Sequence, residues 1–168
     1  MDISKLTKGE QIIGVAAIVF IISTFLPWFT VEAEGFGGAL SEGANGWDVG
    51  FLWARFPALI ALVMLVAIVL DKLTEVQLPD LPVSWGQLHL GLGALVAVLV
   101  LLKLLIGEDA GLSGAEQAFL DDLGISISRA WGIFVALLAA IALAVGGFFK
   151  FQEEKAGVGG AATPPTSF

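Results

Sequence analysis

The first apolar run of the chain, residues 12–29 (IIGVAAIVFIISTFLPWF), constrains its fold more than any other feature. About 18 apolar residues are enough to cross a hydrocarbon core of roughly 30 Å as a helix. Three further apolar blocks follow, and the segments between them hold nearly all the charge. Only 14% of the residues are charged, against about 25% in soluble domains. We therefore predict an integral membrane protein.

The four blocks predict an all-α membrane protein built as an antiparallel four-helix transmembrane bundle. We expect one membrane domain over residues 1–150 and a disordered cytoplasmic tail over residues 151–168, which is rich in small residues and proline. The predicted spans cover residues 11–29, 51–70, 84–106 and 130–149.

A secretory signal peptide is the alternative interpretation of the first block, with Val31-Glu32-Ala33 as the cleavage site. The apolar stretch is longer than the usual signal core of about 7–15 residues. A proline and two aromatic residues beside that site also suit the end of an anchored helix. We favour the anchored helix.

Two small elements are predicted in the segments between the spans. Residues 30–34 alternate polar and apolar side chains, and Asn45-Gly46 is a turn signal, which together predict a β-hairpin. In the third segment, Ser113-x-x-Glu116 is a capping box, followed by apolar residues at helical spacing. This predicts a short amphipathic helix on the membrane surface. Its apolar positions are Leu112, Phe119, Leu120 and Leu123.

The distribution of basic residues predicts the orientation of the spans. Cytoplasmic segments of membrane proteins carry an excess of Lys and Arg. Placing both termini inside puts five bases on that side and three on the other. We therefore expect a multi-pass protein of the plasma membrane with both termini cytoplasmic. The five inner bases are Lys5, Lys8, Lys72, Lys150 and Lys155.

Small residues recur every four positions in the last block, where they form a helix-packing stripe. Residues of this kind let helix backbones approach closely inside a membrane. We favour packing within the chain's own bundle, and a dimer or subunit interface is the alternative. The stripe is Gly132, Ala136, Ala140 and Ala144, and its expected counterparts in the third block are Gly91 and Gly93.

Gln87 and His89 are the strongly polar pair within a predicted span. Titratable groups inside a membrane are candidates for function, for instance in proton or quinone chemistry. One histidine cannot supply both axial ligands of a haem, and no second histidine exists for a metal site. We favour a hydrogen bond across the bundle as the role of His89.

Tryptophans and basic residues mark the expected membrane interfaces. The aromatic anchors are Trp28, Trp47, Trp53, Trp85 and Trp131. The basic anchors are Arg55, Lys103 and Arg129, at the outer ends of their spans. The same three cations could form a ring for an anion pathway. Nine acids in the outer segments oppose that interpretation, because they leave this side at a formal charge of about −6.

Composition and motifs argue against several other functions. The chain has no cysteine, which excludes disulfides and thiolate metal sites. A net charge of −8 argues against binding to nucleic acid, which needs Lys and Arg to neutralise phosphates. We find no calcium-loop pattern and no nucleophile–base pair. We therefore expect no metal, no cofactor and no enzymatic activity.

The chain resembles small, mostly uncharacterised bacterial four-span membrane proteins in two short motifs. Leu26-Pro27-Trp28 ends the first span, and Gly46-Trp47 lies in the outer segment. The layout is also loosely similar to the claudin-like architecture, although the paired cysteines of that family's first loop are absent and this loop is shorter. The resemblance implies four helices and an outer interaction surface.

Together these patterns favour a non-enzymatic structural or accessory subunit of a membrane assembly. It would bind a membrane-protein partner, or a second copy of itself, through the outer segments and the last span. The alternative is a small transporter or channel that uses the polar residues of the third span.

Overall fold

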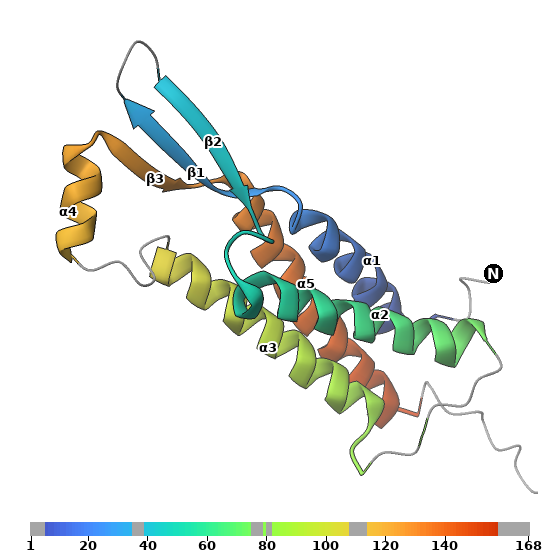
Figure 1. Ribbon diagram of the computed structural model, residues 1–168. Coiled ribbons are helices and arrows are strands. Elements are labelled where there is room, and N and C mark those ends of the chain that lie inside the picture. Colours follow the sequence, from blue (N-terminus) through green and yellow to red (C-terminus); the bar gives the residue numbers. More distant parts are fainter. Residues whose placement is uncertain (1–5, 35–38, 75–78, 80–81, 108–113, 158–168) are drawn as a thin grey trace, which may run out of the picture.

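The computed structural model describes residues 6–34, 39–74, 79, 82–107 and 114–157. In this part of the chain, long helices run side by side, and a small sheet projects beyond one end of them (Figure 1). The long helices are α1 (Lys8–Ser23), α2 (Phe56–Leu73), α3 (Trp85–Ile106) and α5 (Trp131–Lys155), with a π-helical segment η2 (Phe51–Arg55) leading into α2.

Three of these helical segments are long and apolar enough to cross a membrane. This agrees with the prediction that the chain contains membrane-spanning helices, although four were predicted. They cover Phe51–Lys72, Trp85–Ile106 and Trp131–Lys155. α1 has 16 residues. At about 1.5 Å per residue it is roughly 24 Å long, shorter than a hydrocarbon core of roughly 30 Å. Length alone therefore establishes three candidate spans.

The predicted first span, residues 11–29, is too long by six residues at its C-terminal end. α1 ends at Ser23, and the hydroxyl groups of Ser23 and Thr24 donate to carbonyls of the preceding turn at 2.6 and 2.7 Å. Pro27 then begins a strand. Trp28, expected at the headgroup level, is instead fully buried, and its indole N–H donates to the Ser23 carbonyl at 2.8 Å.

The sheet has three antiparallel strands in the order β2-β1-β3. They are β1 (Pro27–Glu34), β2 (Ala39–Asn45) and β3 (Ile125–Arg129). The predicted hairpin is therefore present as β1 and β2, and β3 adds a strand that was not predicted. The Asn45-Gly46 turn follows β2 and leads toward η2.

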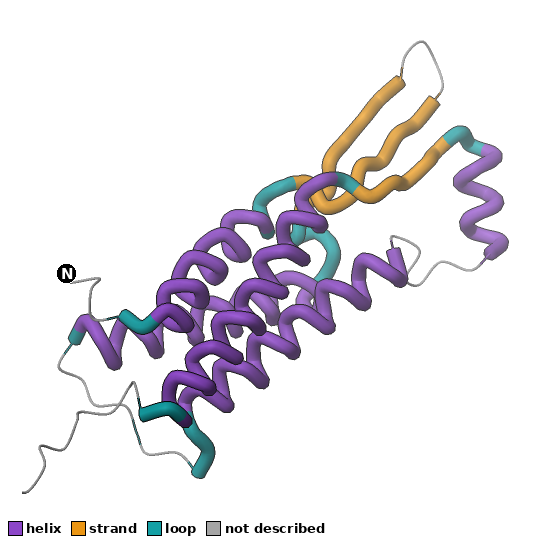
Figure 2. Tube along the Cα trace, turned by 180° about the vertical axis from the view of Figure 1, so that it is seen from behind, coloured by secondary structure: helices purple, strands orange, loops and turns teal. Residues whose placement is uncertain are grey.

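The predicted amphipathic helix corresponds to α4 (Gly114–Asp122), which stands beside the sheet (Figures 1 and 2). Phe119 and Leu123 are exposed there. Two of its predicted residues, Leu112 and the capping Ser113, lie outside the described residues. α5 continues to Lys155, so the segment predicted as a disordered tail begins with helix.

The bundle core lies between α5 and its two neighbours, α1 and α3. α2 also packs against α1 and α3. Small residues set the spacing. A Cβ added at Gly93 would lie 2.7 Å from the backbone nitrogen of Ala144, and one at Gly147 would lie 2.6 Å from that of Leu90. Gly132, Ala136 and Ala140 are buried. Gly91 is exposed, and a Cβ there would meet no atom within 4 Å.

Gly93 and Gly91 offer a matched pair of substitutions. Gly93→Ala should lower the free energy of unfolding by about 1–3 kcal/mol, because the new methyl group overlaps the α5 backbone. Gly91→Ala should leave it unchanged or slightly higher, because alanine is the better helix former. Reversible unfolding in mixed detergent, followed by circular dichroism, measures both. Equal effects of the two variants would contradict the predicted packing.

Candidate functional site

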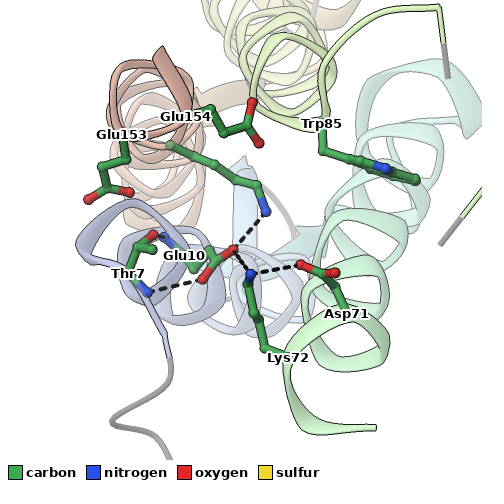
Figure 3. Close-up of a pocket in the computed structure, with 8 residues that line it drawn as sticks. Thr7, Glu10, Asp71, Lys72, Trp85, Glu153 and Glu154 are labelled. Carbon is green, nitrogen blue, oxygen red and sulfur yellow. Dashed lines mark hydrogen bonds and ion pairs between the residues drawn. The ribbon is translucent and has the colours of Figure 1, made fainter. Parts of the chain in front are cut away.

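A group of charged side chains, which we call the charged cluster, lies at the end of the bundle where α1 and α3 begin and α2 and α5 finish (Figure 3). Figure 3 shows side chains from different helices converging on one point. The cluster therefore combines residues that are far apart in the sequence. Its members are Glu10, Asp71, Lys72, Lys150, Glu153 and Glu154.

Glu10 is the centre of the charged cluster. The residue is 2% exposed, and its Oε1 accepts a hydrogen bond from Nζ of Lys150 at 2.9 Å. Nζ of Lys72 lies 3.8 Å from the same oxygen, and Oε2 accepts from the backbone N–H of Thr7 at 3.0 Å. One carboxylate thus caps its own helix and connects α1 to α2 and α5.

Glu153 and Glu154 extend the same connection to the first turns of α1 and α3. Glu153 accepts from the backbone N–H of Gly9 at 3.3 Å, and Glu154 accepts from that of Gly86 at 2.8 Å. The first amides of a helix have no partner within the helix, and negative charge is favourable beside them. The last turn of α5 therefore satisfies amides at the beginning of two other helices.

The charged cluster surrounds a cavity of about 180 Å³, which Thr7 and Trp85 also line. Four carboxylates and two ammonium groups give this lining a formal charge of −2. From the sequence, we used the two lysines only to predict the orientation of the spans. We did not predict that these charged side chains lie together. The available signal was Glu10, a charged residue in a capping box directly before an apolar run.

Gln87 and His89, predicted as an intramembrane polar pair, occupy different environments. Gln87 is exposed and completes a capping box with Ser84, whose backbone N–H donates to the Gln87 side chain at 3.2 Å. His89 is 2% exposed. Its Nδ1 lies 2.7 Å from the Trp85 carbonyl oxygen and its Nε2 lies 3.3 Å from that of Met64, on α2. Each ring nitrogen thus faces a carbonyl oxygen, and a neutral imidazole, which has one N–H, donates to one of the two.

Two of the three basic residues at the sheet end lie together at the C-terminal end of α3, and the third, Arg55, lies at Trp47. Lys103 is buried and donates to the Gly107 carbonyl at 2.7 Å, and Arg129 donates to the Leu104 carbonyl at 2.9 Å. Cations beside the last carbonyls of a helix, here α3, are favourable. Arg55 donates to the Trp47 carbonyl and lies over the Trp47 ring at 5.9 Å. Each cation has a local partner.

The remaining aromatic anchors differ in exposure. Trp47 is 39% exposed and Trp131 is 58% exposed, while Trp53 and Trp85 are half-buried. Trp85 lies at the charged end, where its ring centroid is 6.1 Å from that of His89. These exposures suit membrane interfaces at Trp47 and Trp131.

The sheet has one mixed face and one polar face. Register places Val31 between Ile127 and the acid Glu42, and Glu32 between Ser126 and Ser41, and directly opposed residues share a face. Val31 and Ile127 are half-buried, whereas Glu32 and Ser126 are exposed. Within the described residues, β2 and β3 each pair only with β1, so both edges of the sheet are open.

No family model matches the chain, and no curated protein matches it in sequence. The described residues also contain no group of three or more His, Asp or Glu side chains placed to hold a metal ion. The candidate sites therefore rest on the geometry of this chain: the charged cluster at one end and the open sheet at the other.

The ion pair at the centre of the charged cluster makes a testable contribution to stability. Glu10→Leu leaves the buried Lys150 ammonium without its carboxylate, which should cost about 3–5 kcal/mol. The double variant Glu10→Leu with Lys150→Met removes both charges and should recover most of that loss. Unfolding in mixed detergent measures both, with the exposed Lys155→Met as the control. A double variant no more stable than Glu10→Leu would contradict this role.

Proposed function

We propose that this protein is a non-enzymatic accessory subunit of a membrane assembly and that it binds a membrane-protein partner through its sheet. The observation that supports the proposal is the projecting sheet, whose two edge strands are open within the described residues. Open edge strands offer unpaired backbone groups to a partner. The small residues of α5 contribute to the bundle itself, so we assign the partner surface to the sheet alone.

We further propose that α1 is a fourth crossing helix. It lies within the bundle against α2 and α5. Its outward side carries large apolar side chains, of which Val15 is 65% exposed and Ile22 is 56% exposed. Such a surface is favourable in lipid and costly in water. Local thinning of the bilayer, or interfacial residues at either end, accommodates a short helix.

The distribution of charge supports an orientation with both termini in the cytoplasm of a plasma-membrane protein. Among the described residues, the charged end holds four basic residues and the sheet end holds three. The four are Lys8, Lys72, Lys150 and Lys155, and the three are Arg55, Lys103 and Arg129. This small excess agrees with the tendency of cytoplasmic segments to be basic. The sheet would then face outward.

A rival proposal, the small transporter or channel, finds less support in the middle of the bundle. A conduit needs polar groups along its length. The middle of the bundle is instead filled by apolar residues such as Ala61, Val96 and Ala140, which are fully buried. The charged cluster and His89 lie toward one end, and Lys103 lies toward the other.

Cysteine labelling tests the proposed orientation cleanly, because the chain contains no native cysteine. Ser41→Cys on β2 and Gln152→Cys on α5 both place a thiol at an exposed position, at opposite ends of the molecule. A membrane-impermeant maleimide should label Ser41→Cys in intact cells. It should label Gln152→Cys only after the cells are permeabilised. The reverse pattern, or labelling of both in intact cells, would contradict the orientation.

Site-specific photocrosslinking in living cells tests the partner surface. A photoreactive residue at Ser126 or Ser41, exposed on the edge strands, should yield a discrete crosslinked protein. The same residue at Leu138, which is 69% exposed on the side of α5, serves as the matched control and should yield none. A protein crosslinked through Leu138 and not through either edge strand would assign the partner surface to the helices and refute the proposal.

A further inference from the structure

We propose that the cavity of the charged cluster binds a zwitterionic group that carries a phosphate and a primary amine. This chemistry is shared by the headgroup of phosphatidylethanolamine and by free phosphoethanolamine. The proposal does not depend on the function of the sheet, although the lipid as a source depends on the proposed membrane crossing. It rests on the hydrogen-bond capacity, the charge and the size of the cavity.

Lys72 and Lys150 supply donors for a phosphate. Both ammonium groups lie within 3.8 Å of one oxygen atom, Oε1 of Glu10. An ammonium group has three N–H donors, and Lys150 uses one of them on this oxygen. Glu10 is already engaged at both oxygens, because its Oε2 accepts from Thr7. Lys72 also pairs with Asp71, whose Oδ2 lies 3.2 Å from Nζ. The other two donors of Lys150, which is 5% exposed, have no acceptor among the described residues.

Asp71, Glu153 and Glu154 supply acceptors for an amine in the same cavity. Glu153 and Glu154 already accept backbone N–H groups, and Oδ2 of Asp71 already pairs with Lys72. A carboxylate has about four lone-pair sites, so each of the three can accept a further donor. These three acids would repel a simple anion, and the two lysines would repel a simple cation. A group with one charge of each sign satisfies both halves of the lining.

The cavity is large enough for such a group. Its volume of about 180 Å³ is more than ten times the roughly 10–15 Å³ that a single water molecule needs on the same measure. It lies where the helices end, which is the level of lipid headgroups if the bundle crosses a membrane. Water alone is the competing occupant, and an experiment with defined lipids separates the two.

Native mass spectrometry of the full-length protein in delipidating detergent tests the site. Phosphatidylethanolamine, phosphatidylcholine and phosphatidylglycerol are added separately at equal concentration. We expect phosphatidylethanolamine to bind with the highest affinity, because phosphatidylcholine lacks the amine donors and phosphatidylglycerol lacks the positive charge. Lys72→Gln and Asp71→Asn should each weaken its binding about tenfold. Lys155→Gln, on an exposed residue outside the cavity lining, is the matched control and should bind as the unaltered chain does.

A competition arm identifies the source of the group. Displacement of the lipid by free phosphoethanolamine supports a site that takes the group from water, whereas retention of the lipid supports a membrane source. Equal binding of the three lipids, or binding of phosphatidylethanolamine unaffected by both cavity variants, would overturn the proposal. Circular dichroism checks that each variant is folded. Lys72 and Asp71 are chosen because both side chains are partly exposed, so their replacement leaves the buried Glu10–Lys150 pair in place.

Discussion

The buried carboxylate of Glu10 is the interaction on which the bundle depends at its charged end. It joins α1 to α5 through Lys150 and lies near Lys72 of α2. Burying such charges is costly unless each is paired and its remaining groups are bonded. Here the second carboxylate oxygen caps α1, and the next turn of α5 satisfies amides of α1 and α3 through Glu153 and Glu154. The cost of burial is thus offset by contacts that fix four helices relative to one another.

The two ends of the molecule differ because their charges have different partners. At the charged end, carboxylates bond to the beginnings of helices. At the sheet end, Lys103 and Arg129 bond to carbonyls at the finish of α3. In each arrangement, the charged side chain is opposite in sign to the partial charge of the helix end that it contacts. Between them lies a layer of apolar and small side chains, which suits a scaffold better than a conduit. The sheet continues from this scaffold through Trp28, whose buried indole ties the first strand to the end of α1.

Hydropathy predicted the long helices because twenty or so apolar residues dictate a spanning helix by themselves. It could not predict the early end of α1, where two hydroxyl groups donate to the preceding turn and Trp28 is buried by tertiary packing. β3 was missed although the Ile-Ser-Ile-Ser alternation of residues 125–128 has the period of a half-buried strand. Glu10 could have been singled out from its capping box, but its partner could not, because Lys150 is 140 positions away and only the packing of α1 against α5 brings the two together.

We propose that the bundle is a scaffold and the sheet is a docking surface. Amide hydrogen exchange of the protein in native membrane vesicles, compared with the purified protein in lipid nanodiscs, tests this division of roles. A docked partner should slow exchange along β2 or β3 in the native vesicles and leave α1 and α5 unchanged. Equal exchange of both edge strands in the two preparations, or slower exchange confined to the helices, would contradict the claim.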